Sequence, residues 1–162
     1  MMGFSRIHLA AVAAVLFLAG CGPAPPPPER KPAAAAPKTD PASEPWYGEA
    51  TRELESIARE ASQAFASGRN EQAAAAINRG QPVSARLLAV PRPTLRAVEA
   101  ASDLDHLYGQ MLLMDRNYGW ARLFFQKNVA RWKNRVPQTE DTARRLKQAR
   151  DAIAECDRKI GQ

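Results

Sequence analysis

The sequence has few of the residues that most catalytic and metal sites require. Its 162 residues include two cysteines and two histidines, and His8 lies in an apolar N-terminal stretch that we expect to be removed. A stable zinc site needs three or four ligands at close spacing. The chain also lacks a Cys-x-x-Cys motif, a glycine-rich phosphate loop and a nucleophile–base–acid arrangement. These absences predict a protein that is not an enzyme and needs no cofactor or metal.

One pair of candidate ligands remains in the second half of the chain. Asp103 and His106 lie one helical turn apart, and Asp105 is beside them. Because two ligands on one helix do not complete a metal site, we expect these three residues to form a solvated helix face.

Long apolar runs are also scarce, and the one example, residues 7–19, follows Arg6. This run is shorter than the roughly 20 residues that a transmembrane helix needs. A basic residue, a short apolar run and small residues, here Ala19 and Gly20, are typical of an export signal peptide. We therefore predict that residues 1–20 are a signal peptide and do not contribute to the fold.

The end of this stretch, Leu18-Ala19-Gly20-Cys21, resembles the lipobox of bacterial lipoproteins. The resemblance implies that the Cys21 thiol receives diacylglycerol and that Cys21 becomes the acylated N-terminus of the mature chain. Two or more acyl chains anchor a protein stably. Because Gly22 rather than Asp follows the cysteine, the resemblance implies the periplasmic face of the outer membrane. The alternative is a secreted protein with an incidental cysteine at its cleavage site.

Residues 21–45 are rich in proline and alanine, and nine of the thirteen prolines lie between Pro23 and Pro45. Proline favours the polyproline II conformation over helix or strand. The stretch has no apolar side chain larger than alanine, so it cannot bury enough surface to fold. We predict a disordered, semi-rigid linker that reaches about 70 Å when extended. The alternative is a ligand for a proline-binding groove.

The remaining residues, 46–162, are expected to form one helical domain. Apolar residues recur there at spacings of three and four, without the period of two that strands show. The expected helices span about 46–67, 71–79, 94–116 and 118–135, with a further short helix at 83–90 and a last helix capped by Thr139. Gly68 and Gly80 are expected to end the first two. Short connections predict a compact, antiparallel all-α helical bundle.

A set of five residues, Gly109, Leu112, Tyr118, Ala121 and Phe125, resembles in its spacing the tetratricopeptide repeat, a helical hairpin. In that family a small residue on the first helix lets the second helix pack closely. The resemblance therefore implies that the bundle consists of such hairpins. A bundle whose hairpins share only general packing needs is the alternative.

A fainter match to the same repeat lies 48 residues earlier. It comprises Ala61, Ala64, Gly68, Asn70, Ala73 and Ile77. The later match has Arg116 where the family has a glycine before the turn, and it lacks the closing proline. Because the repeat length is 34, the register requires an insertion of 14 residues, which the stretch from Gln81 to Thr94 accommodates.

The domain is basic, with 19 Lys and Arg against 14 Asp and Glu in residues 46–162. Such a surface attracts nucleic acid, but the predicted export argues against that partner. Anionic head groups, acidic glycans or an acidic protein fit the predicted location better. Many of the cations surround the helix expected at 118–135, and the candidate partner-binding surface on it comprises Trp120, Arg122, Phe124, Lys127 and Arg131. Burial of Trp120 and Phe124 between neighbouring helices is the alternative.

We therefore expect an envelope lipoprotein, anchored through acyl chains on Cys21, whose helical domain binds or positions a protein partner. A structural lipoprotein that binds an anionic cell-wall polymer or head groups is the first alternative, and an envelope enzyme the second. With Cys21 acylated, Cys156 has no disulfide partner in the chain. Its place among apolar residues predicts burial as a small hydrophobic side chain. The sequence leaves the oligomeric state open.

Overall fold

A computed structural model describes residues 40–161 of the chain, and within this range it is helical and has no strand. The elements are η1 (Pro41–Ser43), α1 (Pro45–Ala66), α2 (Asn70–Leu88), α3 (Leu95–Met114), α4 (Tyr118–Trp132) and α5 (Glu140–Ile160). The predicted all-α class is confirmed. The predicted signal peptide, Cys21 and most of the predicted linker lie outside the described residues.

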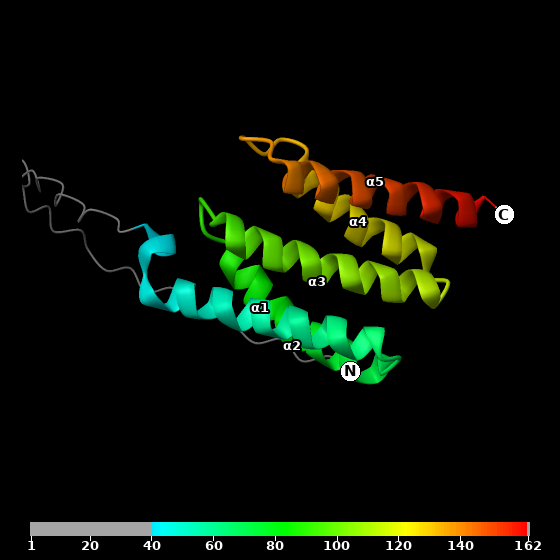
Figure 1. Ribbon diagram of the computed structural model, residues 1–162, viewed down its shortest axis with the longest axis horizontal. Helices are drawn as coiled ribbons and strands as arrows, with labels where there is room; N and C mark the ends of the chain where they lie inside the picture. Colours follow the sequence, from blue (N-terminus) through cyan, green and yellow to red (C-terminus); the bar gives the residue numbers. More distant parts are fainter. Residues whose placement is uncertain (1–39, 162) are drawn as a thin grey trace, which may run out of the picture. The chain divides into compact units, whose positions relative to one another are not determined.

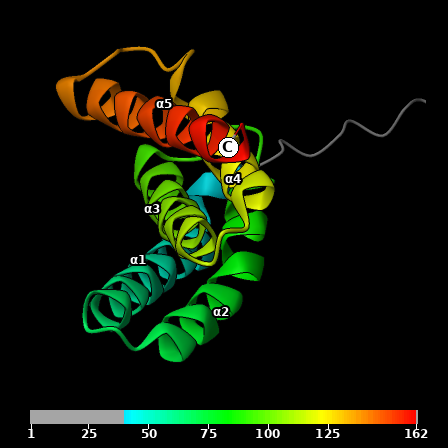
Figure 2. The same cartoon turned by 90° about the vertical axis from the view of Figure 1, so that its right-hand side faces the viewer.

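The five helices run up and down as consecutive antiparallel neighbours. α1 pairs with α2, α3 with α4, and α4 with α5. α3 also packs against both α1 and α2, so it lies between the α1–α2 pair and the α4–α5 pair (Figure 1, Figure 2). α3 is therefore the central helix, and most of its apolar and small residues are buried.

The first hairpin, formed by α1 and α2, contributes most of the residues of the larger hydrophobic cluster. On α1 the apolar residues Leu54, Ile57 and Ala61 are buried, whereas Phe65 near the end of the helix is half-buried. Tyr47 is also buried, and its hydroxyl accepts a hydrogen bond from the Thr94 amide at 3.0 Å. This bond fixes the start of α1 to the start of α3.

The two interhelical turns at 67–69 and 115–117 have the same backbone structure, 48 residues apart. Gly68 has φ of 72°, and Arg116, at the corresponding position, has φ of 59°. In each turn the following amide donates to a carbonyl five residues back, Arg69 to Ala64 at 2.9 Å and Asn117 to Leu112 at 2.8 Å. This is the Schellman pattern that ends a helix at a left-handed residue. Gly68 therefore ends α1 as predicted.

The prediction that Gly80 ends the second helix is wrong, because α2 continues without a break to Leu88. A Cβ on Gly80 would lie 2.6 Å from Leu104 and 3.1 Å from Ile57. The missing side chain thus serves the packing of α2 on α1 and α3 rather than a turn. Pro82 lies inside the same helix on an exposed position, where water can satisfy the carbonyl that loses its amide donor. The separate helix expected at 83–90 is the second half of α2.

The second hairpin, formed by α3 and α4, also depends on a glycine for the close packing of its helices. A Cβ on Gly109 of α3 would lie 2.7 Å from Cε1 of Phe125, which is fully buried on α4. Ala121 is equally buried one turn earlier on α4. The small residue on one helix and the aromatic ring on the other therefore bring α3 and α4 into close contact.

The two left-handed turn positions give opposite predictions for substitution. A Cβ at Gly68 meets no atom within 4 Å, so Gly68→Ala tests backbone strain alone. We expect it to lower the free energy of unfolding by about 1 kcal/mol, and Arg116→Gly to raise it by roughly half as much. Urea unfolding followed by circular dichroism measures both changes.

Gly119→Ala is the matched control for this pair. Gly119 is equally open, but it lies inside α4 with an ordinary helical backbone, so alanine there should be neutral or stabilising. An unchanged stability for Gly68→Ala would show that the left-handed conformation at this turn carries no cost.

Candidate functional site

A buried ion pair joins α3 to α4 in the second half of the domain. Asp105 is 3% exposed, and its Oδ2 lies 2.6 Å from Nη2 of Arg131, whose side chain is 16% exposed. Gln81 on α2 donates a longer hydrogen bond, 3.4 Å, to the other oxygen of Asp105. One carboxylate therefore connects three helices. Sequence analysis placed Asp105 on a solvated face and Arg131 on a binding surface, but the structure pairs them in the interior.

Three further side chains complete this polar network. Arg131 also donates to Oδ1 of Asn128 at 2.6 Å, and Asn128 donates to the backbone carbonyl of Ser102 at 3.0 Å. Nε1 of the fully buried Trp132 donates to the Ser102 hydroxyl at 2.9 Å. Within residues 40–161 no buried side-chain nitrogen or oxygen lacks a partner. Because every buried polar side-chain atom here has a hydrogen-bond partner, the network avoids the free-energy cost of an unpaired polar group in the interior.

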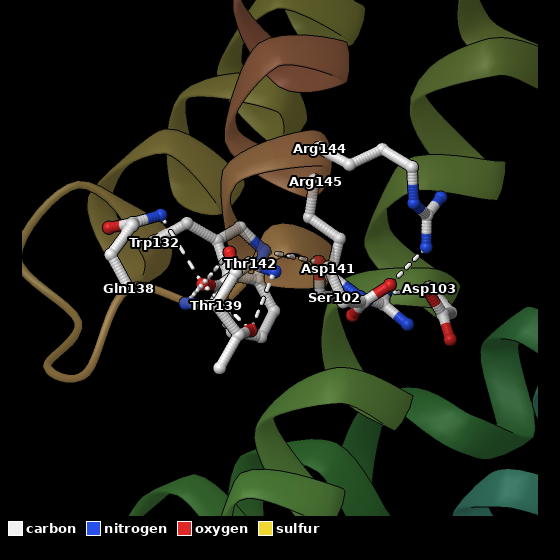
Figure 3. Close-up of polar contacts among 9 residues, drawn as sticks. All are labelled: Ser102, Asp103, Trp132, Gln138, Thr139, Asp141, Thr142, Arg144 and Arg145. Atoms are coloured by element: carbon white, nitrogen blue, oxygen red, sulfur yellow. Dashed lines mark hydrogen bonds and ion pairs between the residues drawn. The ribbon is translucent and has the colours of Figure 1, made fainter.

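Arg145 attaches the start of α5 to this region. Its guanidinium pairs with Asp103 of α3 and with Asp141 of its own helix, and it lies 5.7 Å from the centre of the Trp132 ring. The hydrogen bond from Arg145 to Asp141 holds the pKa of that carboxyl below its ordinary value. Figure 3 shows Ser102, Asp103, Trp132 and the first turn of α5 gathered around Arg145. The arginine thus links α5 to both helices of the second hairpin.

The first turn of α5 is itself fixed by hydrogen bonds between two threonines. Thr139 accepts from the Thr142 amide at 3.2 Å, and its own amide donates to the Thr142 hydroxyl at 2.9 Å. This reciprocal pair is a capping box, which confirms Thr139 as the cap of the last helix.

A groove of about 410 Å³ lies between α1 and α3, with Arg145 at its edge. α1 contributes Glu55, Ala58, Arg59 and Ser62, which have the spacing of one helix face. From α3 the lining includes Arg96, Glu99, Asp103, His106 and Gln110. The groove therefore carries three arginines and three carboxylates, an even mixture of charge.

Two ion pairs bridge the helices that line this groove. Glu55 accepts two hydrogen bonds from Arg96, at 2.9 and 2.8 Å, and this two-point contact joins α1 to α3. Asp103 pairs with Arg145, as described above. Within the described part of the chain, Arg59 and Glu99 have no ion pair, so one cation and one anion of the groove are available to a ligand.

His106 is half-buried in this groove rather than on a solvated face. Its ring centre lies 5.5 Å from that of Phe125. Burial lowers the pKa of His106. The negative charge of Asp103 raises this pKa in part, and the positive charge of Arg145 lowers it further. Protonation is therefore less favourable in the folded than in the unfolded chain, so stability is lost as the pH falls below the ordinary pKa of histidine, near 6.5.

The candidate metal ligands do not converge. Asp103 and His106 face the groove, whereas Asp105 points to Arg131 on the other side of α3. Among residues 40–161 no group of three His, Cys, Asp or Glu side chains could hold an ion. Cys156 is fully buried against Phe125 and Ala121, as predicted, and burial raises the pKa of its thiol.

The predicted partner-binding surface is divided by the structure. Trp120 is 59% exposed, whereas Phe124 is half-buried. The rings of Phe124 and Tyr108 pack edge to face with their centres 4.7 Å apart, and Nζ of Lys127 lies 4.1 Å from the centre of the Phe124 ring. These three residues form one face of α4. Arg122 instead pairs with Asp157 of α5 at 2.7 Å, and Arg131 pairs with Asp105. Burial between helices, the alternative prediction, applies to part of Phe124 but not to Trp120.

Sequence analysis missed Tyr108 as a support for Phe124 and Asp105 as a buried charge. Asp105 follows Leu104 and lies four residues from Ala101, both of which are buried. An acidic residue within the apolar periodicity of a helix could have indicated a buried partner of opposite charge.

Comparisons with known proteins add no identification. No family model matches the chain, and neither the curated proteins nor the solved structures contain a match. No helix in residues 40–161 is long and apolar enough to cross a bilayer.

Removing one partner of the buried ion pair should destabilise the domain strongly. Arg131→Met leaves the Asp105 carboxylate buried without a cation, and we expect a loss of about 3–5 kcal/mol in the free energy of unfolding. The double variant Asp105→Leu/Arg131→Met removes both charges and should recover at least half of this loss. Urea unfolding measures both.

The exposed pair Arg122–Asp157 supplies the control. Its side chains are 38% and 51% exposed, so Arg122→Met should cost less than about 1 kcal/mol. Equal losses for Arg131→Met and Arg122→Met would contradict the assignment of Asp105–Arg131 as a desolvated pair.

Proposed function

We propose that the protein is a lipoprotein of the bacterial envelope, anchored through acyl chains on Cys21, whose helical domain binds or positions a protein partner without catalysing a reaction. The anchor is proposed from the lipobox-like sequence at residues 18–21, and Gly22 after the cysteine supports a location at the periplasmic face of the outer membrane. The observation that carries the binding role is the groove between α1 and α3, with its unpaired Arg59 and Glu99.

The groove suits a segment of polypeptide. Its volume of about 410 Å³ lies within the range of ligand sites in proteins. Cations and anions are mixed along its walls, and arginine is among the side chains that contribute most to protein interfaces. The bridge Glu55–Arg96 joins the two walls, and Asp103–Arg145 joins the α3 wall to α5. A partner segment of mixed charge therefore finds a preformed surface.

The repeated hairpin supports the same proposal. The turns after α1 and α3 share their hydrogen bonds and left-handed residues at a spacing of 48. Stacked helical hairpins create extended binding surfaces along one set of helices, and here the groove lies between the first helices of the two hairpins. We propose that the domain is a pair of tetratricopeptide-like hairpins closed by α5.

The anchor is tested by metabolic labelling with a radioactive or alkyne-tagged fatty acid. We expect the wild-type protein to incorporate label and to fractionate with the outer membrane. Cys21→Ser should abolish labelling, because the thiol that forms the thioether is lost. A wild-type protein without label would contradict the proposed anchor.

The binding role is tested by site-specific photocrosslinking in intact cells. A photoreactive amino acid at Gln110, on the exposed wall of the groove, should give a discrete crosslinked protein that a variant with Arg59→Ala and Glu99→Ala captures less well. The same photoreactive residue at Ala75, an exposed position of α2 outside the groove, is the control. Equal crosslinking from both positions would contradict the groove as the site.

A further inference from the structure

The outward face of α4 is an exposed stripe that no other helix covers. Trp120, Leu123, Lys127, Ala130 and, just past the helix, Asn134 follow one another at spacings of three and four, and all five are exposed. Trp120 is 59% and Leu123 42% exposed. Val136, in the loop after the helix, is 88% exposed. Half of the six exposed large hydrophobic side chains of the described residues therefore lie on or beside this stripe.

The charge along this segment has one sign. From Arg116 to Thr139 the sequence contains six Lys and Arg residues and no Asp or Glu. Two of the cations, Arg122 and Arg131, are neutralised by carboxylates of α5 and α3. Arg116, Lys127, Lys133 and Arg135 have no ion pair within residues 40–161. The stripe and the turns that flank α4 thus combine an exposed tryptophan with four cations that have no ion pair in this part of the chain.

The shape of this surface favours a membrane over a protein as its partner. The residues that dominate protein interfaces fill or form pockets, whereas Trp120 and Leu123 lie on an exposed helix face and line neither the groove between α1 and α3 nor the hollows at the start of α5 and beside Met111. A bilayer interface needs no such complementarity. Tryptophan is enriched at the head-group level, and anionic lipids attract nearby Lys and Arg.

The attachment point of the domain is compatible with this contact. Because the helices run up and down, the loop at 133–138 lies at the same end of the bundle as the start of α1, next to η1, the first element of the described chain (Figure 1). Residues 22–39 connect this end to Cys21 and span at most about 55 Å in an extended form. α1, with 22 residues, is about 33 Å long. The connection is therefore long enough for α4 to lie along the membrane that holds the anchor.

We infer that the stripe of α4, with Arg116, Lys133, Arg135 and Val136, docks the domain onto a bilayer that contains anionic phospholipids. The inference rests on the proposed lipid anchor, which brings the domain to the bilayer. Trp120 and Leu123 enter the head-group region, while the four cations contact lipid phosphates. Docking in this orientation leaves the groove between α1 and α3 on a different face of the molecule.

Fluorescence quenching in vesicles tests the inference on the full acylated protein. It is reconstituted into vesicles of phosphatidylcholine alone, or of equal parts phosphatidylcholine and phosphatidylglycerol, with acyl chains brominated in both. Trp120 is the most exposed of the three tryptophans, since Trp132 is fully buried and Trp46 lies under Arg86. We expect quenching in the anionic vesicles alone, its loss in Trp120→Phe, and its loss at about 1 M salt, where screening is strong.

Charge reversal provides the matched comparison. Lys127→Glu/Lys133→Glu should lower the ratio of docked to undocked protein by more than about tenfold. Arg52→Glu/Arg92→Glu makes the same change in net charge at exposed positions outside the stripe and should leave that ratio within about twofold of wild type. Circular dichroism checks that both variants are folded, and the salt series on the wild type needs no variant.

Flotation separates the two proposals. The acyl anchor predicts that the protein floats with both kinds of vesicle, whereas docking concerns quenching of Trp120 alone. Flotation without quenching in anionic vesicles would overturn the docking inference and leave the stripe to an acidic protein or polymer. Equal quenching in both lipids, or equal loss in the two charge-reversal variants, would overturn it as well. Failure to float with phosphatidylcholine would instead contradict the anchor.

Discussion

The arrangement of α2, α3 and α4 depends on the buried carboxylate of Asp105. A charge that is 3% exposed is tolerable only with a partner of opposite sign and further hydrogen bonds. Arg131 supplies the charge, and Gln81 supplies a hydrogen bond from the first hairpin. Sliding α4 along α3 by one turn would separate Arg131 from Asp105 and Asn128 from the Ser102 carbonyl. The polar network therefore selects one register among those that the apolar contacts alone would allow.

This network also divides the cations of α4 into two groups. Arg122 and Arg131 are turned toward α5 and α3, and they hold the helix in place. Lys127 and the cations of the flanking turns form no ion pair within residues 40–161. A helix with six cations in and around it can therefore be packed on two faces and still present positive charge on the third. Both proposed surfaces depend on this division of the cations. The groove requires α3 to be held in place, and the docking stripe requires α4 to be held in place.

Periodicity predicted the helices well because each one buries a face. The all-α class, the left-handed end at Gly68 and the capping role of Thr139 all follow from local patterns. Gly80 was misassigned because glycine has two uses, ending a helix and admitting a close neighbour, and the sequence around Gly80 does not show that Leu104 and Ile57 lie against it.

The candidate surface was harder to predict than the fold for a related reason. Spacing shows which residues of α4 share a face, but it does not show what lies opposite that face. Trp120 and Asn128 are eight residues apart on α4, a multiple of the spacing of four, yet Trp120 is exposed and Asn128 is buried beside Ser102. The groove could not be predicted from the sequence at all. Its walls belong to α1 and α3, and residues such as Glu55 and Arg96 are brought together only by the packing of these two helices.

Residue-resolved amide hydrogen exchange of wild-type protein and Asp105→Asn tests the central role of this carboxylate most directly. The variant keeps the size of the side chain and removes the charge that pairs with Arg131. The account predicts that amides of α4 and α5 lose much more protection than those of α1 and α2, because the second hairpin opens without its fixed register. An equal loss in all helices, or unchanged protection in α4, would contradict it.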